Sequence, residues 1–417
     1  MREKLVRDAV HGDIELEPLE VELVDTPEFQ RLRGIKQLGT ASLVYPSATH
    51  SRFEHSLGTS WMARRMIEAL RRTSTISSDD ATAIRVAALL HDITHIPFGH
   101  TLEDERRVLP RHDKDESRFT YFLMESSLAR RLGSSGFQNQ VVRILRGEAG
   151  FASEIITGAI TADLLDYLRR DTYFAGFSQY YDPRVFRSFI LEEGRFVVNL
   201  EKNGMLRRDA LSELINLLRI RYTLSERVYF HHTKIASGAM ISKAVELALE
   251  SGLRREDLRG LKDETLIWVL RENHRNHPAI AHLTGCLESR QLYRACYVLT
   301  VDVGEERQKE IVSRYHYGAG NREKLEAEIA GAVGLAPHQV IVYCPSIGMS
   351  LPEAEVLVRL EDGRVEPLSG SNNDEIRALK LKHKALWKFF VFIDRCAWDR
   401  KELAHRAAAE LLQPASH

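Results

Sequence analysis

The sequence lacks paired cysteines, a strong net charge and any long apolar run. Its four cysteines (Cys286, Cys296, Cys344 and Cys396) lie far apart and form no C-x-x-C pair. This spacing argues against a zinc ribbon and against a disulfide framework, and it favours reduced thiols in a cytosolic protein. The formal net charge of -1 provides no global basic field, so we expect no strong binding to nucleic acid or to an anionic membrane.

Segments that would target the chain or anchor it in a membrane are also missing from the pattern. No apolar stretch approaches the roughly 18 residues of a membrane span, and the residues after Met1 lead into no apolar core of a signal peptide. We therefore expect a cytoplasmic protein. With 417 residues, of which 44% are apolar, the chain can bury a large core, and we expect two lobes.

The spacing of the apolar residues changes near residue 285. From Leu19 to about His282 they recur mostly at helical spacing. After Gly285, short apolar runs at 295–301 and 340–343 predict strands, with helical patterns between and after them. We therefore predict a mainly α protein with a helical lobe over residues 1–284 and a smaller α+β lobe over residues 285–417.

The most informative feature is the pair His91 and Asp92, which directly follows the apolar run 86–90. A helix of that composition packs in a core, where an imidazole beside a carboxylate is costly unless something compensates. A divalent metal ion compensates both groups, because it takes a neutral histidine nitrogen and a carboxylate oxygen together. His95 and His100 follow shortly afterwards, and three histidines so close to a core helix point to a site.

Four residues on separate predicted helices offer one metal site. His55 lies at the start of one helix, His91 and Asp92 lie on a second, and Asp163 lies on a third. Inward-pointing ligands from different helices commonly build such a site. Two histidines and two aspartates suit Fe, Mn, Mg, Co or Zn and leave positions for water and a substrate oxygen. The alternative is that Asp163 belongs to a solvated charged face together with Asp166, Arg169, Arg170 and Asp171.

A second histidine cluster and a late aspartate are interpreted differently. His274, His277 and His282 surround Pro278, and we expect surface residues there, a metal site being the alternative. Asp394 is expected among surface and interface charges. We therefore assign the predicted function to the site formed by His55, His91, Asp92 and Asp163.

The order of a histidine, a His-Asp pair and a later aspartate resembles the HD superfamily of metal-dependent phosphohydrolases. The longer strings 25–39 and 51–58 are similar to the deoxynucleoside triphosphate triphosphohydrolase family. The resemblance covers roughly residues 4–238 and, more loosely, the C-terminal part. It implies a homo-oligomer, dimer or tetramer, in which a metal-activated water attacks the α-phosphorus of a nucleotide and releases deoxynucleoside and triphosphate.

The resemblance also assigns roles at matching positions, with the four residues above as the metal ligands. His112 matches the general acid for the departing 5′ oxygen, a role that suits an imidazole because its pKa lies near neutrality. Glu103 stands where the family has an aspartate that orients the catalytic histidine. His95 and His100 match active-site histidines that contact the phosphates, and His95 would help to stabilise the charge that builds there. The substrate-binding matches are Arg52 and Arg221 for phosphate and Gln37, Tyr167 and Asp171 for the deoxyribose.

Three positions depart from the family pattern near the phosphate tail. Leu164 stands where the family has a Lys or Arg, Ser225 replaces a histidine, and His232 replaces a lysine. Because a cationic contact is lost, a mono- or diphosphate phosphatase or a phosphodiesterase is the alternative. A nucleotide-sensing or single-strand-binding module is a third hypothesis, against which the near-neutral charge argues.

The resemblance implies an activator site as well. Lys4, Asp25, Gln30 and Arg33 match positions at which a guanine nucleotide bridges subunits in the family. An Asp-Gln-Arg set can recognise guanine by paired hydrogen bonds. The alternative is that much of this string belongs to the core of the fold.

Overall fold

The computed structural model describes residues 3–413, which begin with a hairpin and continue as a series of helices. Strands β1 (Lys4–Asp8) and β2 (Gly12–Leu16) pair antiparallel. The helices that follow are α1 (Pro18–Val24), α2 (Pro27–Gln30), α3 (Arg52–Leu70), α4 (Ser78–Leu90), α5 (Glu116–Thr120), α6 (Ser127–Ser134), α7 (Gln138–Leu145), α8 (Phe151–Thr157) and α9 (Ala162–Phe174).

Local capping fixes where the three helices with the predicted metal ligands begin. Ser51 and Glu54 form a capping box at the start of α3, while the hydroxyls of Ser77 and Thr161 accept backbone N–H groups at the starts of α4 and α9. The apolar run 86–90 is fully buried on α4. Helix α3 packs against both α4 and α9. Helix α4 ends at Leu90, so His91 and Asp92 lie directly after it and not on it as predicted. Both residues still lie beside His55 on α3 and Asp163 on α9.

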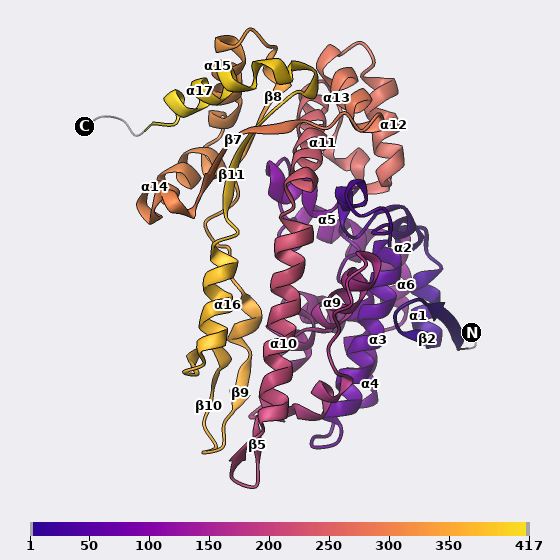
Figure 1. Ribbon diagram of the computed structural model, residues 1–417. Helices are drawn as coiled ribbons and strands as arrows, with labels where there is room; N and C mark the ends of the chain where they lie inside the picture. The colour runs from indigo at the N-terminus through magenta and orange to yellow at the C-terminus, as the bar shows by residue number, and fades with distance from the viewer. Residues whose placement is uncertain (1–2, 414–417) are drawn as a thin grey trace.

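After α9 the chain forms two hairpins and then two long helices. The strands are β3 (Phe189–Glu192), β4 (Arg195–Asn199), β5 (Glu201–Lys202) and β6 (Met205–Leu206), and the helices are α10 (Arg208–Leu224), α11 (His232–Glu250), α12 (Asp263–Asn273) and α13 (Pro278–Glu288). Helices α10 and α11 follow one another along the length of the molecule (Figure 1). No helix between residues 3 and 413 combines the length and apolarity needed to cross a membrane.

The rest of the chain mixes strands and helices, which confirms the predicted fold class. Its elements are β7 (Arg294–Thr300), α14 (Glu305–Ile311), α15 (Asn321–Ala332), β8 (Val340–Tyr343), β9 (Leu357–Arg359), β10 (Val365–Pro367), α16 (Asp374–Lys384), β11 (Lys388–Ile393) and α17 (Lys401–Leu411). Strand β11 lies between β7 and β8 and is antiparallel to both. Helices α15 and α17 pack against this sheet.

A second sheet connects the two predicted lobes. Its strand order is β10-β9-β4-β3, and β9 runs parallel to β4. The buried residues Val358, Leu368 and Ile376 belong to the same apolar core as α3, α4 and α9, and α16 packs on α10. The division at residue 284 stays a prediction. The hydrogen bonds of this sheet cross that boundary and bring a late segment of the chain to the helical part.

Candidate active site

The four predicted metal ligands converge where α3, α4 and α9 meet. The Nε2 atom of His55 lies 2.9 Å from Oδ1 of Asp163 and 3.2 Å from Nε2 of His91. The carboxylate oxygens of Asp92 lie 3.7 Å and 3.5 Å from the same two nitrogens. Donor atoms that each stand about 2.1 Å from one ion are about 3 Å apart, so this spacing fits a single divalent ion.

The second ring nitrogen of each histidine is held by the protein. Nδ1 of His55 lies 2.7 Å from Oδ2 of Asp166, and Nδ1 of His91 lies 2.7 Å from the carbonyl oxygen of Ala88. A carbonyl oxygen only accepts, so Nδ1 of His91 carries a proton and Nε2 is the nitrogen left for an ion. This is the tautomer that a metal ion requires, and the donor set therefore fits a divalent ion.

Asp166 is a site residue whose role the sequence analysis missed. It is fully buried, its oxygens accept hydrogen bonds from Arg170 at 2.8 Å and 2.9 Å, and Oδ1 lies 2.6 Å from Nε2 of His11. A solvated charged face is therefore wrong for Asp166 and Arg170. The available signal was spacing, because Asp166 follows Asp163 by three residues and shares its side of α9.

Charges within this group shift one another's pKa values. Burial lowers the pKa of His55, but the hydrogen bonds and charges of Asp163 and Asp166 outweigh burial and raise it to about 10. Burial raises the pKa of Asp92, yet the charges of Arg52 and the nearby histidines hold it well below its usual range. The carboxylates are thus ionised, as cation binding requires.

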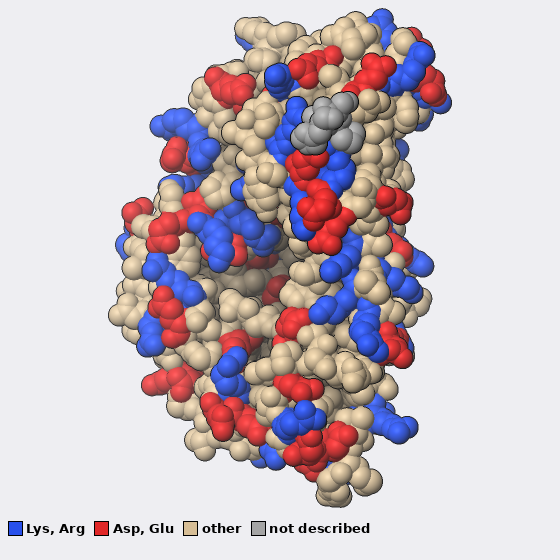
Figure 2. Space-filling model, turned by 90° about the vertical axis from the view of Figure 1, so that its left-hand side faces the viewer, with Lys and Arg blue, Asp and Glu red and all other residues tan. Residues whose placement is uncertain are grey.

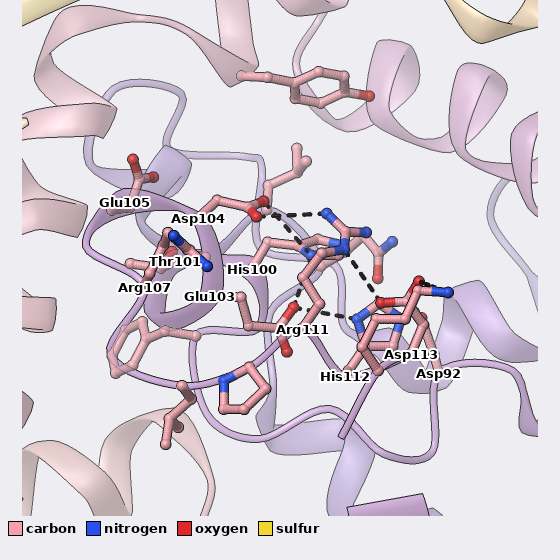
Figure 3. Close-up of a pocket in the computed structure, with 18 of the residues that line it drawn as sticks. Asp92, His100, Thr101, Glu103, Asp104, Glu105, Arg107, Arg111, His112 and Asp113 are labelled. Atoms are coloured by element: carbon pink, nitrogen blue, oxygen red, sulfur yellow. Dashed lines mark hydrogen bonds and ion pairs between the residues drawn. The ribbon is translucent and has the colours of Figure 1, made fainter. Parts of the chain in front are cut away.

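A second histidine group lies beside the ligands. Figure 3 shows Glu103 between His100 and His112, and Oε2 of Glu103 lies 3.1 Å and 3.2 Å from their Nδ1 atoms. The ring of His95 stacks on that of His112 with centroids 3.7 Å apart. Arg118 donates to the other oxygen of Glu103 at 3.1 Å. The structure thus brings together the three residues predicted to be catalytic.

The environment of this group suits proton transfer. Burial lowers the pKa of His112, and the hydrogen bond and charge of Glu103 partly oppose that shift. Because Glu103 engages Nδ1, the proton available to a ligand is the one on Nε2. His95 is fully buried and does not line the cavity, and its Nε2 lies 3.3 Å from Oδ1 of Asp92.

A cavity of about 1270 Å³ opens beside both groups, which is large enough for a nucleotide. Figure 2 shows a hollow on one face of the molecule, with basic and acidic side chains around it. All six residues predicted to bind substrate line the cavity: Gln37, Arg52, His100, Tyr167, Asp171 and Arg221. Leu164 does not line it and is buried in the apolar core. The individual roles of these residues stay predictions.

Arg221, which lines the cavity, forms an ion pair with a buried carboxylate that the sequence analysis did not anticipate. Arg221 donates from Nε to Oε1 of Glu353 at 3.1 Å, and the Tyr167 hydroxyl lies 3.4 Å from the same oxygen. Glu353 is buried and comes from the segment before β9. On the neighbouring side, the Tyr229 hydroxyl donates to Oδ2 of Asp171 at 2.6 Å.

A histidine from a distant part of the chain lies beside Ser225. Ser225 is fully buried, and its hydroxyl lies 3.2 Å from Nε2 of His383 on α16. His383 lines the cavity. A histidine therefore stands near this part of the cavity although residue 225 is a serine, and no local pattern could have indicated it.

The residues predicted to bind an activator form two surface pairs. Lys4 contacts Asp25 at 3.3 Å, and both side chains are more than half exposed. Arg33 donates to Oε1 of Gln30 at 2.8 Å, and its guanidinium lies 3.5 Å from the centroid of the Phe53 ring. An activator site at these residues stays a prediction.

Two family models match this chain. The model of the HD domain matches residues 52–171, and the model of the HD associated region matches residues 194–415. The first range contains all four converging ligands. The second range contains Arg221, Glu353 and His383, which places both halves of the family architecture around the cavity.

Comparison with individual proteins gives relatives of the same kind. An uncharacterised protein of Methanocaldococcus jannaschii is 33% identical over 296 residues, covering 70% of this chain and 59% of that protein. The deoxynucleoside triphosphate triphosphohydrolase SAMHD1 of Homo sapiens is 29% identical over 277 residues, covering 58% of this chain and 44% of that protein. The chain spans about half the length of the curated relatives it matches. The crystal structure of a phosphohydrolase from Bacteroides thetaiotaomicron has the same fold, with a TM-score of 0.73, 24% identity and coverage of 94% of this chain and 100% of that one.

Proposed function

We propose that this chain, which belongs to the HD-domain family of phosphohydrolases with an HD-associated region, hydrolyses deoxynucleoside triphosphates to deoxynucleoside and triphosphate. The observation that carries the proposal is the convergence of His55, His91, Asp92 and Asp163 beside a nucleotide-sized cavity. The names of relatives that share the HD domain, such as human SAMHD1, support the substrate class.

The protein groups divide the work of hydrolysis between them. His55, His91, Asp92 and Asp163 would hold a divalent ion, which supplies a Lewis acid and lowers the pKa of a bound water. Arg52, which donates to Asp92, would place positive charge where a phosphate oxygen becomes more negative.

His112 and Gln37 would act on the leaving group and the sugar. With Nδ1 of His112 engaged by Glu103, its Nε2 proton would go to the departing 5′ oxygen. Gln37 lines the cavity, and its buried Oε1 has no hydrogen-bond partner among the described residues. A buried acceptor of this kind gains free energy from a ligand hydroxyl, so Gln37 would accept a hydrogen bond from the deoxyribose.

The Arg221–Glu353 pair favours a second candidate, a nucleoside mono- or diphosphate phosphatase or a phosphodiesterase with the same metal centre. A guanidinium already paired with a carboxylate attracts a polyphosphate less strongly than a free one. Leu164 adds no charge at the cavity, since it is buried in the core. Both features reduce the positive charge available to a triphosphate tail.

Product analysis distinguishes the two candidates. The purified chain would receive Mn²⁺ or Fe²⁺ and all four deoxynucleoside triphosphates, with and without GTP, and the products would be identified by ion chromatography and mass spectrometry. Intact triphosphate that disappears in Asp92→Ala supports the leading proposal, and GTP dependence supports the activator site. Orthophosphate, or no turnover of triphosphates, contradicts the leading proposal and supports the second candidate.

A further inference from the structure

A third group of metal-donor side chains lies outside the cavity. His282 and Cys286 project from α13, and Asp394 directly follows β11. Figure 1 shows α13 at the end of the molecule that carries β7, β8 and β11. Because His282 and Cys286 are four residues apart on one helix, they share a face, and Asp394 approaches that face from the sheet.

The three side chains meet at one atom. Nε2 of His282 lies 2.7 Å from Oδ2 of Asp394 and 3.6 Å from Sγ of Cys286. The donor atoms of the three residues all lie within 4.8 Å of one another. The expectation that Asp394 is a surface charge is wrong, because this residue is fully buried; the tertiary structure places it behind His282.

The geometry of this cluster differs from that of a catalytic relay. In a nucleophile–histidine–acid relay, the nucleophile and the acid contact different ring nitrogens. Here Cys286 and Asp394 both approach Nε2 of His282, so the imidazole cannot pass a proton from one to the other. Sulfur, nitrogen and oxygen atoms gathered within 4.8 Å of one another are donor types that a tetrahedral zinc ion accepts.

Polar neighbours hold the carboxylate in place. Gln339 donates from Nε2 to Oδ2 of Asp394 at 3.0 Å, and the backbone N–H of Cys396 donates to Oδ1 at 2.9 Å. Hydrogen bonds of this kind typically orient a ligating carboxylate. Asp394 is therefore positioned by groups other than His282.

Exposure differs among the three donors. Cys286 is buried, whereas the side chain of His282 is 31% exposed. An ion would be shielded on the side of the thiol and the carboxylate and would be open to water beside the imidazole. This leaves one position for a water molecule or another exogenous ligand.

We propose that His282, Cys286 and Asp394 form a Zn²⁺ site that ties α13 to the end of β11. A thiolate beside an imidazole favours Zn²⁺ over hard cations such as Mg²⁺, and the sulfur distinguishes this site from the cavity centre. Binding releases the thiol proton of Cys286 and the proton shared by His282 and Asp394. The proposal is independent of the reaction catalysed at the cavity.

The test uses the full chain, freed of metal with a chelator and reloaded with Co²⁺ as a spectroscopic substitute for Zn²⁺. A thiolate ligand gives Co²⁺ a charge-transfer band in the near ultraviolet, which nitrogen and oxygen ligands do not give. Wild type and Asp92→Ala should both show the band, and Cys286→Ser should lose it. Cys296→Ser is the matched control, because its thiol on β7 donates to the carbonyl oxygen of Val391, and it should keep the band.

Zn²⁺ affinity provides a second measurement that removes no donor atom. Gln339→Ala should weaken Zn²⁺ binding about 10- to 100-fold, as loss of an orienting partner does. This variant decides the question if Cys286→Ser fails to fold. Absence of the band in wild type, a band that survives in Cys286→Ser, or unchanged affinity in Gln339→Ala would each overturn the proposal.

Discussion

The centre at α3, α4 and α9 and the cluster at α13 and β11 both combine histidine with aspartate, but they hold the histidines differently. At the first centre, Nδ1 of His55 and of His91 is engaged by Asp166 and by a backbone carbonyl, and both Nε2 atoms face the ligand position. At the second cluster, the aspartate contacts the same Nε2 atom of His282 that the thiol approaches. Asp163 likewise faces Nε2 of His55 at 2.9 Å, so an ion at either place replaces a histidine–aspartate contact. The first centre differs because a separate group orients each of its two rings through Nδ1.

The difference extends to the choice of metal. The first centre offers only imidazole and carboxylate, which suit several divalent ions that act on phosphate oxygens. The second offers the thiol of Cys286, which favours Zn²⁺. One lies beside a large cavity and the other does not line it, so we assign chemistry to the first and a structural tie to the second.

The largest expected effect is a loss of activity when the first centre, and not the second cluster, is altered. Asp92→Ala removes a metal donor and the partner of Arg52, so we expect nucleotide hydrolysis to fall by at least about 1000-fold. Initial rates at saturating Mn²⁺ measure this, with Cys296→Ser as the control that keeps wild-type activity. A rate in Asp92→Ala close to wild type would refute a catalytic first centre.

The second prediction concerns Nδ1 of His55, which Asp166 engages. Asp166→Asn preserves the shape of the side chain but removes the charge that faces Nδ1 of His55. Metal affinity should fall about 10- to 100-fold, and activity should recover as Mn²⁺ is increased. Activity titrations against Mn²⁺ measure the shift. Equal affinity in the variant and wild type would show that the tautomer needs no orienting carboxylate here.

The proposed role of His112 as general acid leads to a prediction about pH. Glu103 opposes the effect of burial on the pKa of His112, so Glu103→Gln should lower that pKa further. A general acid must be protonated, and activity is lost as the pH rises through its pKa. The alkaline limb of the kcat/KM profile should therefore move to lower pH in Glu103→Gln. A limb at the wild-type position would assign the acid to another group.

The smallest expected effect concerns stability at the second cluster. Zn²⁺ at 100 times its Kd stabilises a folded chain by about 2.7 kcal/mol, which corresponds to a rise of a few degrees in Tm. The single variant Asp92→Ala, in which the first centre is weakened, should keep this rise in Tm. Adding Gln339→Ala to that variant should reduce the rise. Thermal melts with Zn²⁺ and with Mg²⁺ compare the two ions, and an equal rise with Mg²⁺ would contradict a thiolate site.

Local patterns were informative where neighbours in sequence share one environment. The apolar run 86–90 predicted a buried helix. The polar pair His91 and Asp92 directly after it predicted a metal site, because a buried imidazole and carboxylate need a compensating ion. The converging distances at His55, His91 and Asp163 are consistent with that prediction. The strands expected at 295–301 and 340–343 also match β7 and β8.

Residues whose partners lie far along the chain were not predictable in this way. Glu353 meets Arg221 across 132 positions, and His383 meets Ser225 across 158. Asp394 was assigned to the surface, although it contacts His282 across 112 positions in a buried place. Single sequences contain no periodicity that connects such residues.

The sequence by itself determined the class of fold and the side-chain types gathered at the predicted metal site, because apolar spacing, capping residues and side-chain types act over a few positions. Only the tertiary structure decided that β9 pairs with β4, that the segment around Glu353 and His383 reaches the cavity, and that Cys286 meets His282 and Asp394. The physical reason is that long-range contacts are selected by the collective burial of apolar surface in the whole chain.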